Sequence, residues 1–257
     1  MKVIVITNQK GGVGKTSTAI ELASLFGEEY RTLVIDLDAQ RNMSRYSGAD
    51  LTKPGVLEAL NDEADIQDCI QHLDRYDIMV SSKKLSNAQL MFSEPDSIFI
   101  LNDVLDEIRA NKETCPEIVI VDTPPGRGML LYMSYLAADY IVAVAECDDG
   151  SAEGIDELYL DLKRFASRNQ CHAIFAGIIL NKFEKTGMHQ VALEDLSEVA
   201  QDYGAMMFTP VRKSIAVTKA KSVSMPVTKF APRVNASLDF RKVYEELCDV
   251  IKKNEKQ

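Results

Sequence analysis

A glycine-rich stretch near the start of the chain brings together the residue types that bind phosphate. It consists of Gly11, Gly12, Val13, Gly14, Lys15, Thr16 and Ser17. Glycines let the backbone turn so that successive N–H groups face phosphate oxygens, and the positive end of a following helix adds to the attraction. Lys15 would reach the outer phosphates of a nucleotide, and the Thr16 hydroxyl would bind Mg²⁺. The spacing therefore predicts a phosphate-binding loop.

Three aspartates that follow apolar runs would complete such a site. Asp36 and Asp38 follow the run TLVI, and Asp122 ends the run EIVIV. Residues two apart on a strand point to the same side, so Asp36 and Asp38 would share a face. Asp122 would face the Mg²⁺ shell through water. Carboxylates close to one another need a cation, which Mg²⁺ bound to ATP would supply.

Strand and helix patterns alternate along the chain and would place these residues at strand ends. Apolar, β-branched runs predict strands at 2–7, 31–36, 117–121, 140–145 and 173–180. Helical spacing of apolar residues predicts helices at 15–26, 131–138, 153–167, 191–203 and 236–252. This alternation is typical of an α/β fold with a mostly parallel, twisted sheet and helices on both faces. We expect residues 1–257 to form one domain, although 50–95 are too irregular to assign.

Composition excludes several classes of protein. The 257 residues are 46% hydrophobic and 26% charged, which is typical of a soluble globular chain and excludes disorder. No apolar run approaches the roughly 20 residues that span a bilayer, and the N-terminus lacks a secretory signal, so we expect a cytoplasmic protein. Five cysteines without a C-x-x-C pair and only three histidines do not favour a redox or transition-metal enzyme.

Charge is distributed unevenly along the chain. The net charge is −10, but the segment 205–234 holds six basic residues and no acidic one. These are Arg212, Lys213, Lys219, Lys221, Lys229 and Arg233. Such a cluster suits an anionic partner such as the phosphates of nucleic acid, and its alternative role is a solvated basic face on an acidic protein.

Three motifs in order resemble those of the ParA/MinD ATPases. The stretch KGGVGKT, which begins at Lys10, resembles their deviant Walker A motif. The segment 36–40, DLDAQ, resembles their second acidic motif, and 119–125, VIVDTPP, resembles their Walker B segment. The resemblance extends over most of the chain. It implies a P-loop NTPase fold, hydrolysis of ATP with Mg²⁺, and a homodimer that forms around ATP.

The resemblance also implies roles for single residues. The lysine that matches Lys10 crosses to the partner subunit's nucleotide, and the aspartate that matches Asp38 positions the attacking water. Thr16, Asp36 and Asp122 would then serve the magnesium ion. Asn181 matches an asparagine on the adenine side, and Pro210 matches the proline of the next base-contacting loop. Ala39 and Arg41 replace the usual proline and glycine of the family's switch loop.

A later segment resembles the small Soj-type ParA proteins in particular. Residues 210–230 are similar to the stretch after the last core strand, where basic residues of the ATP dimer bind DNA without sequence preference. The resemblance makes Arg212, Lys213, Lys219 and Lys221 candidates for contact with double-stranded DNA, and implies association with the nucleoid in the ATP-bound state. It also implies a centromere-binding partner of the ParB type that stimulates slow hydrolysis.

Two other functions share this site chemistry. A MinD-like or regulatory ATPase would recruit a protein or a membrane, although the terminal IKKNEKQ has no apolar face that would insert into a bilayer, so we expect no membrane partner. A metabolic or redox enzyme would use a second substrate that the sequence does not identify. The chain starts at its phosphate-loop strand, so we expect no N-terminal helix-turn-helix domain. Salt-sensitive DNA binding would distinguish the ParA type from the MinD type, and iron content would identify a redox enzyme.

Overall fold

The computed structural model describes residues 1–148, 150–168 and 170–255. In this part of the chain the apolar runs form eight strands: β1 (Lys2–Thr7), β2 (Thr32–Asp36), β3 (Gln71–His72), β4 (Asp77–Met79), β5 (Ile118–Asp122), β6 (Tyr140–Ala145), β7 (Ile174–Leu180) and β8 (Met206–Met207). Most of them are rich in Val and Ile, whose branched side chains suit an extended backbone.

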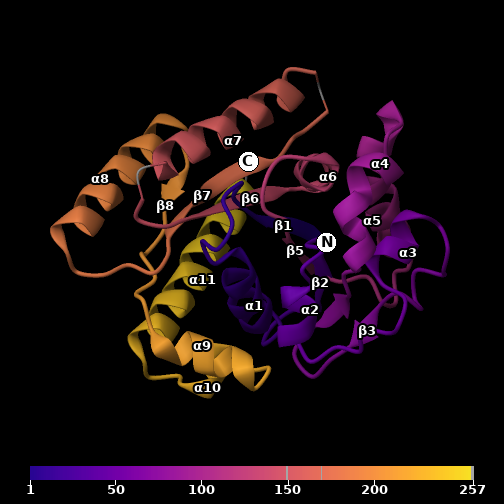
Figure 1. Ribbon diagram of the computed structural model, residues 1–257, viewed down its shortest axis with the longest axis horizontal. Helices are drawn as coiled ribbons and strands as arrows, with labels where there is room; N and C mark the ends of the chain where they lie inside the picture. The colour runs from indigo at the N-terminus through magenta and orange to yellow at the C-terminus, as the bar shows by residue number, and fades with distance from the viewer. Residues whose placement is uncertain (149, 169, 256–257) are drawn as a thin grey trace.

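The strands form one sheet in the order β3-β4-β2-β5-β1-β6-β7-β8. Neighbouring strands are parallel, except that β3 is antiparallel to β4. The register between β2 and β5 pairs Asp36 with Asp122 at their carboxyl ends. The central strand β1 lies between β5 and β6 and leads directly into the phosphate loop (Figure 1). This arrangement confirms the predicted α/β fold of the P-loop NTPase type.

Helices connect the strands and cover both faces of the sheet. The longer helices are α1 (Lys15–Phe26), α5 (Ile100–Ala110), α6 (Met129–Ala137), α7 (Ser151–Ala166), α8 (Gly187–Asp202), α9 (Ile215–Ser222) and α11 (Asn235–Asn254). Shorter helices are α2 (Asn42–Tyr46), α3 (Val56–Leu60), α4 (Ala88–Met91) and α10 (Val227–Phe230), with 3₁₀ turns at Lys83–Asn87 and Pro95–Phe99.

The hydrophobic core is divided by the sheet into two clusters. Val3 and Val5 of β1 face the cluster to which α5, α6, α7 and α8 contribute. Ile4 and Ile6, which alternate with them, face the cluster to which α1 and α11 contribute. Figure 1 shows α1 and α11 packed beside each other. Strand residues are therefore apolar on both faces, because both faces are covered.

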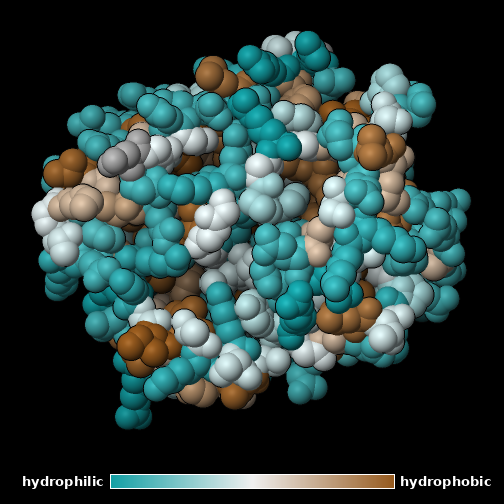
Figure 2. All heavy atoms as spheres, viewed as in Figure 1, coloured by the Kyte–Doolittle hydropathy of each residue, from teal (hydrophilic) through white to brown (hydrophobic). Residues whose placement is uncertain are grey.

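Several elements lie outside the sequence prediction. The irregular stretch 50–95 contains α3, α4 and the short strands β3 and β4, and α5 follows it. The predicted long helices and strands are present, with ends that differ by a few residues. No helix in the described ranges is long and apolar enough to cross a membrane. The face shown in Figure 2 is mainly hydrophilic, with scattered hydrophobic residues.

Candidate nucleotide-binding site

The phosphate loop connects β1 to α1 and leaves the start of that helix open. Gly12 and Gly14 have φ angles of 83° and 101°, a region that favours glycine. No side chain caps the N-terminus of α1. Its first backbone N–H groups therefore remain available for an anion, as in other phosphate loops.

Lys15 is held inside this loop before any phosphate arrives. Its side chain is buried, and Nζ donates a hydrogen bond to the carbonyl oxygen of Lys10 at 2.8 Å. Burial lowers the pKa of Lys15, while the nearby carboxylates of Asp122 and Asp38 act in the opposite direction. The ammonium group thus lies between the loop backbone and the acidic strand ends, as the phosphate-binding role requires.

Asp36 is fixed by hydrogen bonds at the end of β2. Its Oδ2 accepts from the backbone N–H of Ser44 at 2.8 Å and from the Ser44 hydroxyl at 2.6 Å. Its Oδ1 accepts from the backbone N–H of Asp38 at 3.1 Å. Burial raises the pKa of Asp36 to about 6, although these hydrogen bonds oppose the shift. Ser44 in turn accepts from the N–H of Ser81 at 2.9 Å, so the carboxylate is supported from a second loop.

Asp122 differs from Asp36 because its carboxylate accepts no hydrogen bond from the backbone of the described residues. It is fully buried, and neither of its oxygens has a hydrogen-bond partner in the described part of the chain. Burial raises its pKa well above the usual range and the neighbouring Asp36 adds to the increase, whereas the Thr16 hydroxyl and the charge of Lys15 oppose it. A buried carboxylate without partners is costly, and a divalent cation beside it would remove that cost. The chemistry of Asp122, Asp36 and Thr16 therefore fits a magnesium ion.

Asp38 begins a tight switch loop that does not contain the family's glycine. The carbonyl oxygen of Asp38 accepts from the Arg41 N–H at 2.7 Å and from the Ser81 hydroxyl at 2.7 Å. Oδ1 of Asp38 accepts from the Gln40 N–H at 2.9 Å. Arg41, which stands in the glycine position, has a φ of 58° and therefore adopts the left-handed conformation that glycine favours. A non-glycine residue therefore incurs the cost of the left-handed backbone at this position.

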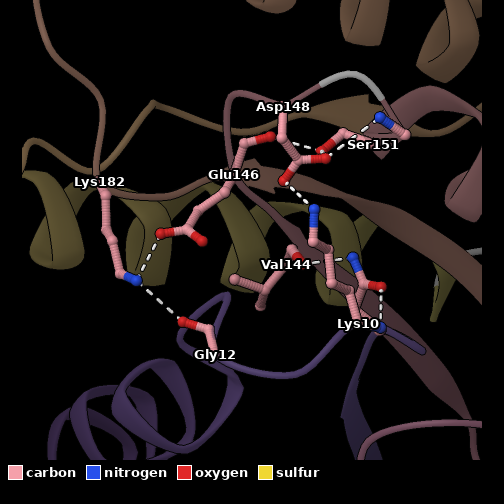
Figure 3. Close-up of polar contacts among 9 residues, drawn as sticks. Lys10, Gly12, Val144, Glu146, Asp148, Ser151 and Lys182 are labelled. Atoms are coloured by element: carbon pink, nitrogen blue, oxygen red, sulfur yellow. Dashed lines mark hydrogen bonds and ion pairs between the residues drawn. The ribbon is translucent and has the colours of Figure 1, made fainter.

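Lys10 extends away from its own phosphate loop. Figure 3 shows its ammonium group against Asp148, at a distance of 2.6 Å from Oδ2. About half of the Lys10 side chain, 52%, is exposed. Its backbone N–H donates to the Asn8 side chain at 2.8 Å, which orders the start of the loop. Within one chain, therefore, the ammonium group of Lys10 contacts Asp148, whereas that of Lys15 contacts the backbone of the phosphate loop.

A further lysine, Lys182, contacts the same loop. Its Nζ donates to the carbonyl oxygen of Gly12 at 2.9 Å and pairs with Glu146, as Figure 3 shows. The preceding residue, Asn181, is buried and donates from Nδ2 to the carbonyl oxygen of Val13 at 2.8 Å. The loop after β7 therefore packs against the phosphate loop and forms hydrogen bonds with its backbone carbonyl groups. The predicted contact of Asn181 with the adenine stays a prediction, and the motifs in the sequence predict no role for Lys182.

Two neighbouring cavities open around these residues. One, of about 190 Å³, is lined mainly by the phosphate loop and by the switch loop after Asp38. The second, of about 330 Å³, is lined by Asn181, by residues 211–215 and by part of α9. Its place beside the phosphate loop is suited to the rest of a nucleotide. Pro210 lies one residue outside this lining, so its contact with a base stays a prediction.

The basic candidates for DNA contact lie in different surroundings. Arg212 forms hydrogen bonds with buried Asp239, from Nε at 2.8 Å and from its backbone N–H at 3.0 Å. Lys213 pairs with Glu184 at 2.8 Å. Lys219 is exposed, whereas Lys221 is partly buried and lines both cavities. The four residues therefore do not form one uniform cationic patch.

The supporting serines were missed by sequence reasoning. Ser44 and Ser81 position Asp36 and the switch loop, but they lie far apart in the sequence and in no recognised motif. Lys182 had one available signal, because it directly follows the candidate Asn181 at a strand end.

Comparisons with known proteins agree with this geometry. A family model described as an AAA domain matches residues 1–174, and the chain belongs to that family. Within it, the chain is of the ParA/Soj type among the ParA/MinD P-loop ATPases. The sporulation initiation inhibitor protein Soj of Bacillus subtilis is 26% identical over 262 residues, covering 98% of this chain and 99% of Soj. The chromosome partitioning protein ParA of Caulobacter vibrioides is 27% identical over 256 residues, covering 96% of this chain and 94% of ParA.

Solved structures show the same fold. Apo McdA of Cyanothece superposes with a TM-score of 0.86 at 22% identity, covering 98% of this chain and 99% of McdA. The septum site-determining protein MinD of Pyrococcus horikoshii, in complex with Mg-ADP, superposes with a TM-score of 0.76 at 19% identity, covering 96% and 95%. These similarities show that this chain shares the fold of McdA and MinD.

Proposed function

We propose that this protein is a magnesium-dependent ATPase whose ATP-bound dimer binds DNA without sequence preference and serves DNA partitioning. The observation that carries the ATPase assignment is the arrangement around Lys15. Its buried ammonium group faces two acidic strand ends, and one of them, Asp122, has no hydrogen-bond partner among the described residues. Such a site is incomplete without an anion for Lys15 and a cation for Asp122.

Each residue of the site would have a separate role in ATP hydrolysis. Lys15 and the open start of α1 would hold the phosphates, and Thr16, Asp36 and Asp122 would hold Mg²⁺. When bound, Mg²⁺ supplies positive charge that offsets the charge of the phosphate oxygens. Asp38 would orient the attacking water, and its loop is already held by the Ser81 hydroxyl. Slow turnover is expected until a partner completes the site.

The exposed position of Lys10 supports an ATP-dependent homodimer. In one chain its ammonium group pairs with Asp148 and not with its own loop. A second subunit that faces this rim would offer the phosphates of its nucleotide instead. Lys10 would then neutralise phosphate charge in trans, as an arginine finger does.

The DNA-binding part of the proposal rests on fewer charges than the sequence predicts. Arg212, Lys213 and Lys229 each pair with an acidic residue. Lys219 and Arg233 are exposed and have no ion pair in the described part of the chain, so they are the stronger candidates for contact with phosphates. The partner that stimulates hydrolysis would be a centromere-binding protein of the ParB type, and the ATP-bound dimer would lie on the nucleoid.

Binding to a random-sequence duplex tests this function directly. Binding would be measured at low and moderate salt, with Mg²⁺ and either ATP, ADP or no nucleotide. Only the ATP state should bind, and affinity should fall steeply with salt. The double variant Lys219→Glu/Arg233→Glu should bind at least about tenfold more weakly, because each lost phosphate contact removes a released counterion. Lys112→Glu, which reverses an exposed charge after α5, is the matched control.

A second candidate function has its own supporting observation. The same segment exposes apolar side chains, with Ile215 75%, Val223 53% and Phe230 41% exposed. Hydrophobic residues are visible at the surface near the start of α9 in Figure 2. Such residues favour a protein partner, as in a MinD-like or regulatory ATPase. Failure to bind DNA under every nucleotide condition, with ATP-dependent dimerisation intact, would favour this function instead.

A further inference from the structure

Lys221 occupies a place that its sequence position does not suggest. It belongs to the last turn of α9, within the segment that resembles a DNA-binding region. Its side chain nevertheless lines the phosphate-loop cavity together with Lys15 and Thr16. It also lines the neighbouring cavity with Asn181. Among the residues that line the two cavities, only Ser17 and Lys221 are shared.

Lys221 has no direct ion pair in the described part of the chain, although Asp122 and Glu21 lie near enough to attract its charge. Other lysines of this region do form ion pairs. Its ammonium group lies 5.4 Å from the centre of the Tyr46 ring, a distance at which a cation is weakly attracted. Burial lowers the pKa of Lys221 and the charge of nearby Lys182 lowers it further, whereas the carboxylates of Asp122 and Glu21 act in the opposite direction. A partly buried cation beside other cations is stabilised by an anion.

The geometry of the two cavities indicates which anion. A nucleotide whose outer phosphates lie on the phosphate loop, and whose base lies toward Asn181, must cross from one cavity to the other. The phosphate nearest the sugar would be at that crossing, beside Ser17 and Lys221. A cation at this point would be attracted to a negatively charged phosphate, whereas a neutral ribose would offer it no opposite charge. Lys182 cannot take this role as it stands, because Glu146 and the Gly12 carbonyl already hold it.

We propose that Lys221 binds the sugar-proximal phosphate of the nucleotide within its own subunit. Lys221 is then a nucleotide-binding residue and not a DNA contact. This inference rests on the proposed ATPase site and adds a ligand-binding residue to it. Because Lys221 and exposed Lys219 lie on the same short helix, α9 presents one lysine to the nucleotide and another to solvent.

Three variants separate these roles. Lys221→Met removes the charge and keeps the side-chain length, Lys221→Arg keeps the charge, and Lys219→Met makes the same change on the exposed side of α9. ADP with Mg²⁺ is the probe, and its dissociation constant is measured by calorimetry. We expect Lys221→Met to weaken ADP binding about tenfold or more, the usual effect of losing a hydrogen bond to a charged group. Lys221→Arg should restore most of the affinity, and Lys219→Met should match the wild type.

The remaining outcomes are also decisive. Without nucleotide, Lys221→Met should melt at or above the wild-type temperature, because no ion pair of the described residues is lost and a partly buried charge is removed, and it should gain less stability from ADP. Wild-type ADP affinity in Lys221→Met, with weaker DNA binding, would overturn the inference and return Lys221 to the DNA surface. Equal weakening in Lys219→Met would also overturn it, because a general loss of positive charge would then explain the effect. Absence of ADP binding by the wild-type protein would instead contradict the proposed ATPase site.

Discussion

At the scale of single residues, the acidic strand ends set the requirements of the site. Asp36 and Asp122 are neighbours in the sheet, yet Asp36 accepts hydrogen bonds from the backbone and from Ser44, whereas Asp122 has, among the described residues, only Thr16 and Lys15 nearby to oppose the effect of burial. A carboxylate that is buried and unsupported destabilises the folded chain when it ionises. Ionisation of Asp122 therefore lowers the stability of the nucleotide-free protein, and a bound cation would offset this loss.

Replacing Asp122 by asparagine should change the free energy of unfolding by an amount that depends on pH. Near pH 4 the buried carboxyl is neutral, and the substitution should change the free energy of unfolding little. As pH rises, the carboxyl ionises readily in the unfolded chain, whose pKa is near 3.8, but resists ionisation in the folded one. The wild type therefore loses stability relative to Asp122→Asn, and at pH 7 we expect the variant to be more stable by about 1 to 3 kcal/mol.

Urea denaturation of both proteins without nucleotide, from pH 4 to pH 8, measures this difference. Asp36→Asn is the contrasting variant, because it should lose stability through its broken hydrogen bonds with Ser44. A constant difference between the wild type and Asp122→Asn over the whole range would refute the prediction.

At the scale of elements, the conformation of the phosphate loop depends on the side chain that packs against it, Asn181. Gly12 and Gly14 both have a positive φ, but their surroundings differ. A Cβ atom on Gly12 would meet nothing within 4 Å, whereas one on Gly14 would lie 2.0 Å from Nδ2 of Asn181. The close approach of Asn181 is what fixes the end of the loop and the start of α1.

The two glycines should therefore respond differently to alanine. Gly12→Ala should cost about 1 to 2 kcal/mol, the price of the left-handed backbone alone. Gly14→Ala should cost at least about 1 kcal/mol more, because it also displaces the buried Asn181 amide from the Val13 carbonyl. Chemical denaturation of both variants gives the comparison. Adding Asn181→Ala to each should remove the difference, and its persistence would point to another cause.

The elements also show which parts of the fold can be predicted from sequence. Strand β1 and helix α1 have the predicted bounds, since their apolar patterns are regular and the loop between them has a recognisable spacing. The pattern of Leu101, Val104, Leu105 and Ile108 would also have predicted α5, and all four are buried. Strands β3 and β4 have only two and three residues, too few for a periodic pattern.

The candidate site was predictable only where a motif carries it. Lys15, Asp36, Asp38 and Asp122 follow from motifs and strand ends. The hydrogen bond between Arg212 and Asp239 could not be predicted, because Asp239 comes from a distant helix, and the contact of Arg212 with DNA stays a prediction. Lys221 faces the nucleotide cavities for a similar reason, since the packing of α9 and not the local sequence decides its direction.

At the scale of the whole molecule, Lys10 should decide whether two subunits assemble. Its ammonium group is exposed at the rim of the site and is paired only with Asp148 among the described acidic residues. Lys10→Ala should abolish the ATP-dependent dimer, while ADP affinity should change less than about threefold, since the residue acts on the partner's nucleotide. Sedimentation in an Asp38→Ala background, where hydrolysis should be lost, compares the dimers without interference from turnover.

Asp148→Ala is the control for that experiment, because it removes the same ion pair and leaves Lys10 in place. It should still form the dimer. If the Lys10→Ala dimer is as stable as that of the control, the hypothesis that Lys10 binds the partner subunit's nucleotide is wrong.

The sheet order has a consequence for how the protein is made. Strand β1 leaves the ribosome well before both of its partners, because β5 and β6 begin at or after Ile118. Until they emerge, the strand that carries the phosphate loop has two unpaired edges of apolar residues, which invite pairing with other chains. ATP therefore cannot assist the early nascent chain, because Asp122 has not yet been synthesised. We therefore expect dependence on a chaperone to be greatest between the synthesis of β1 and that of β5 and β6.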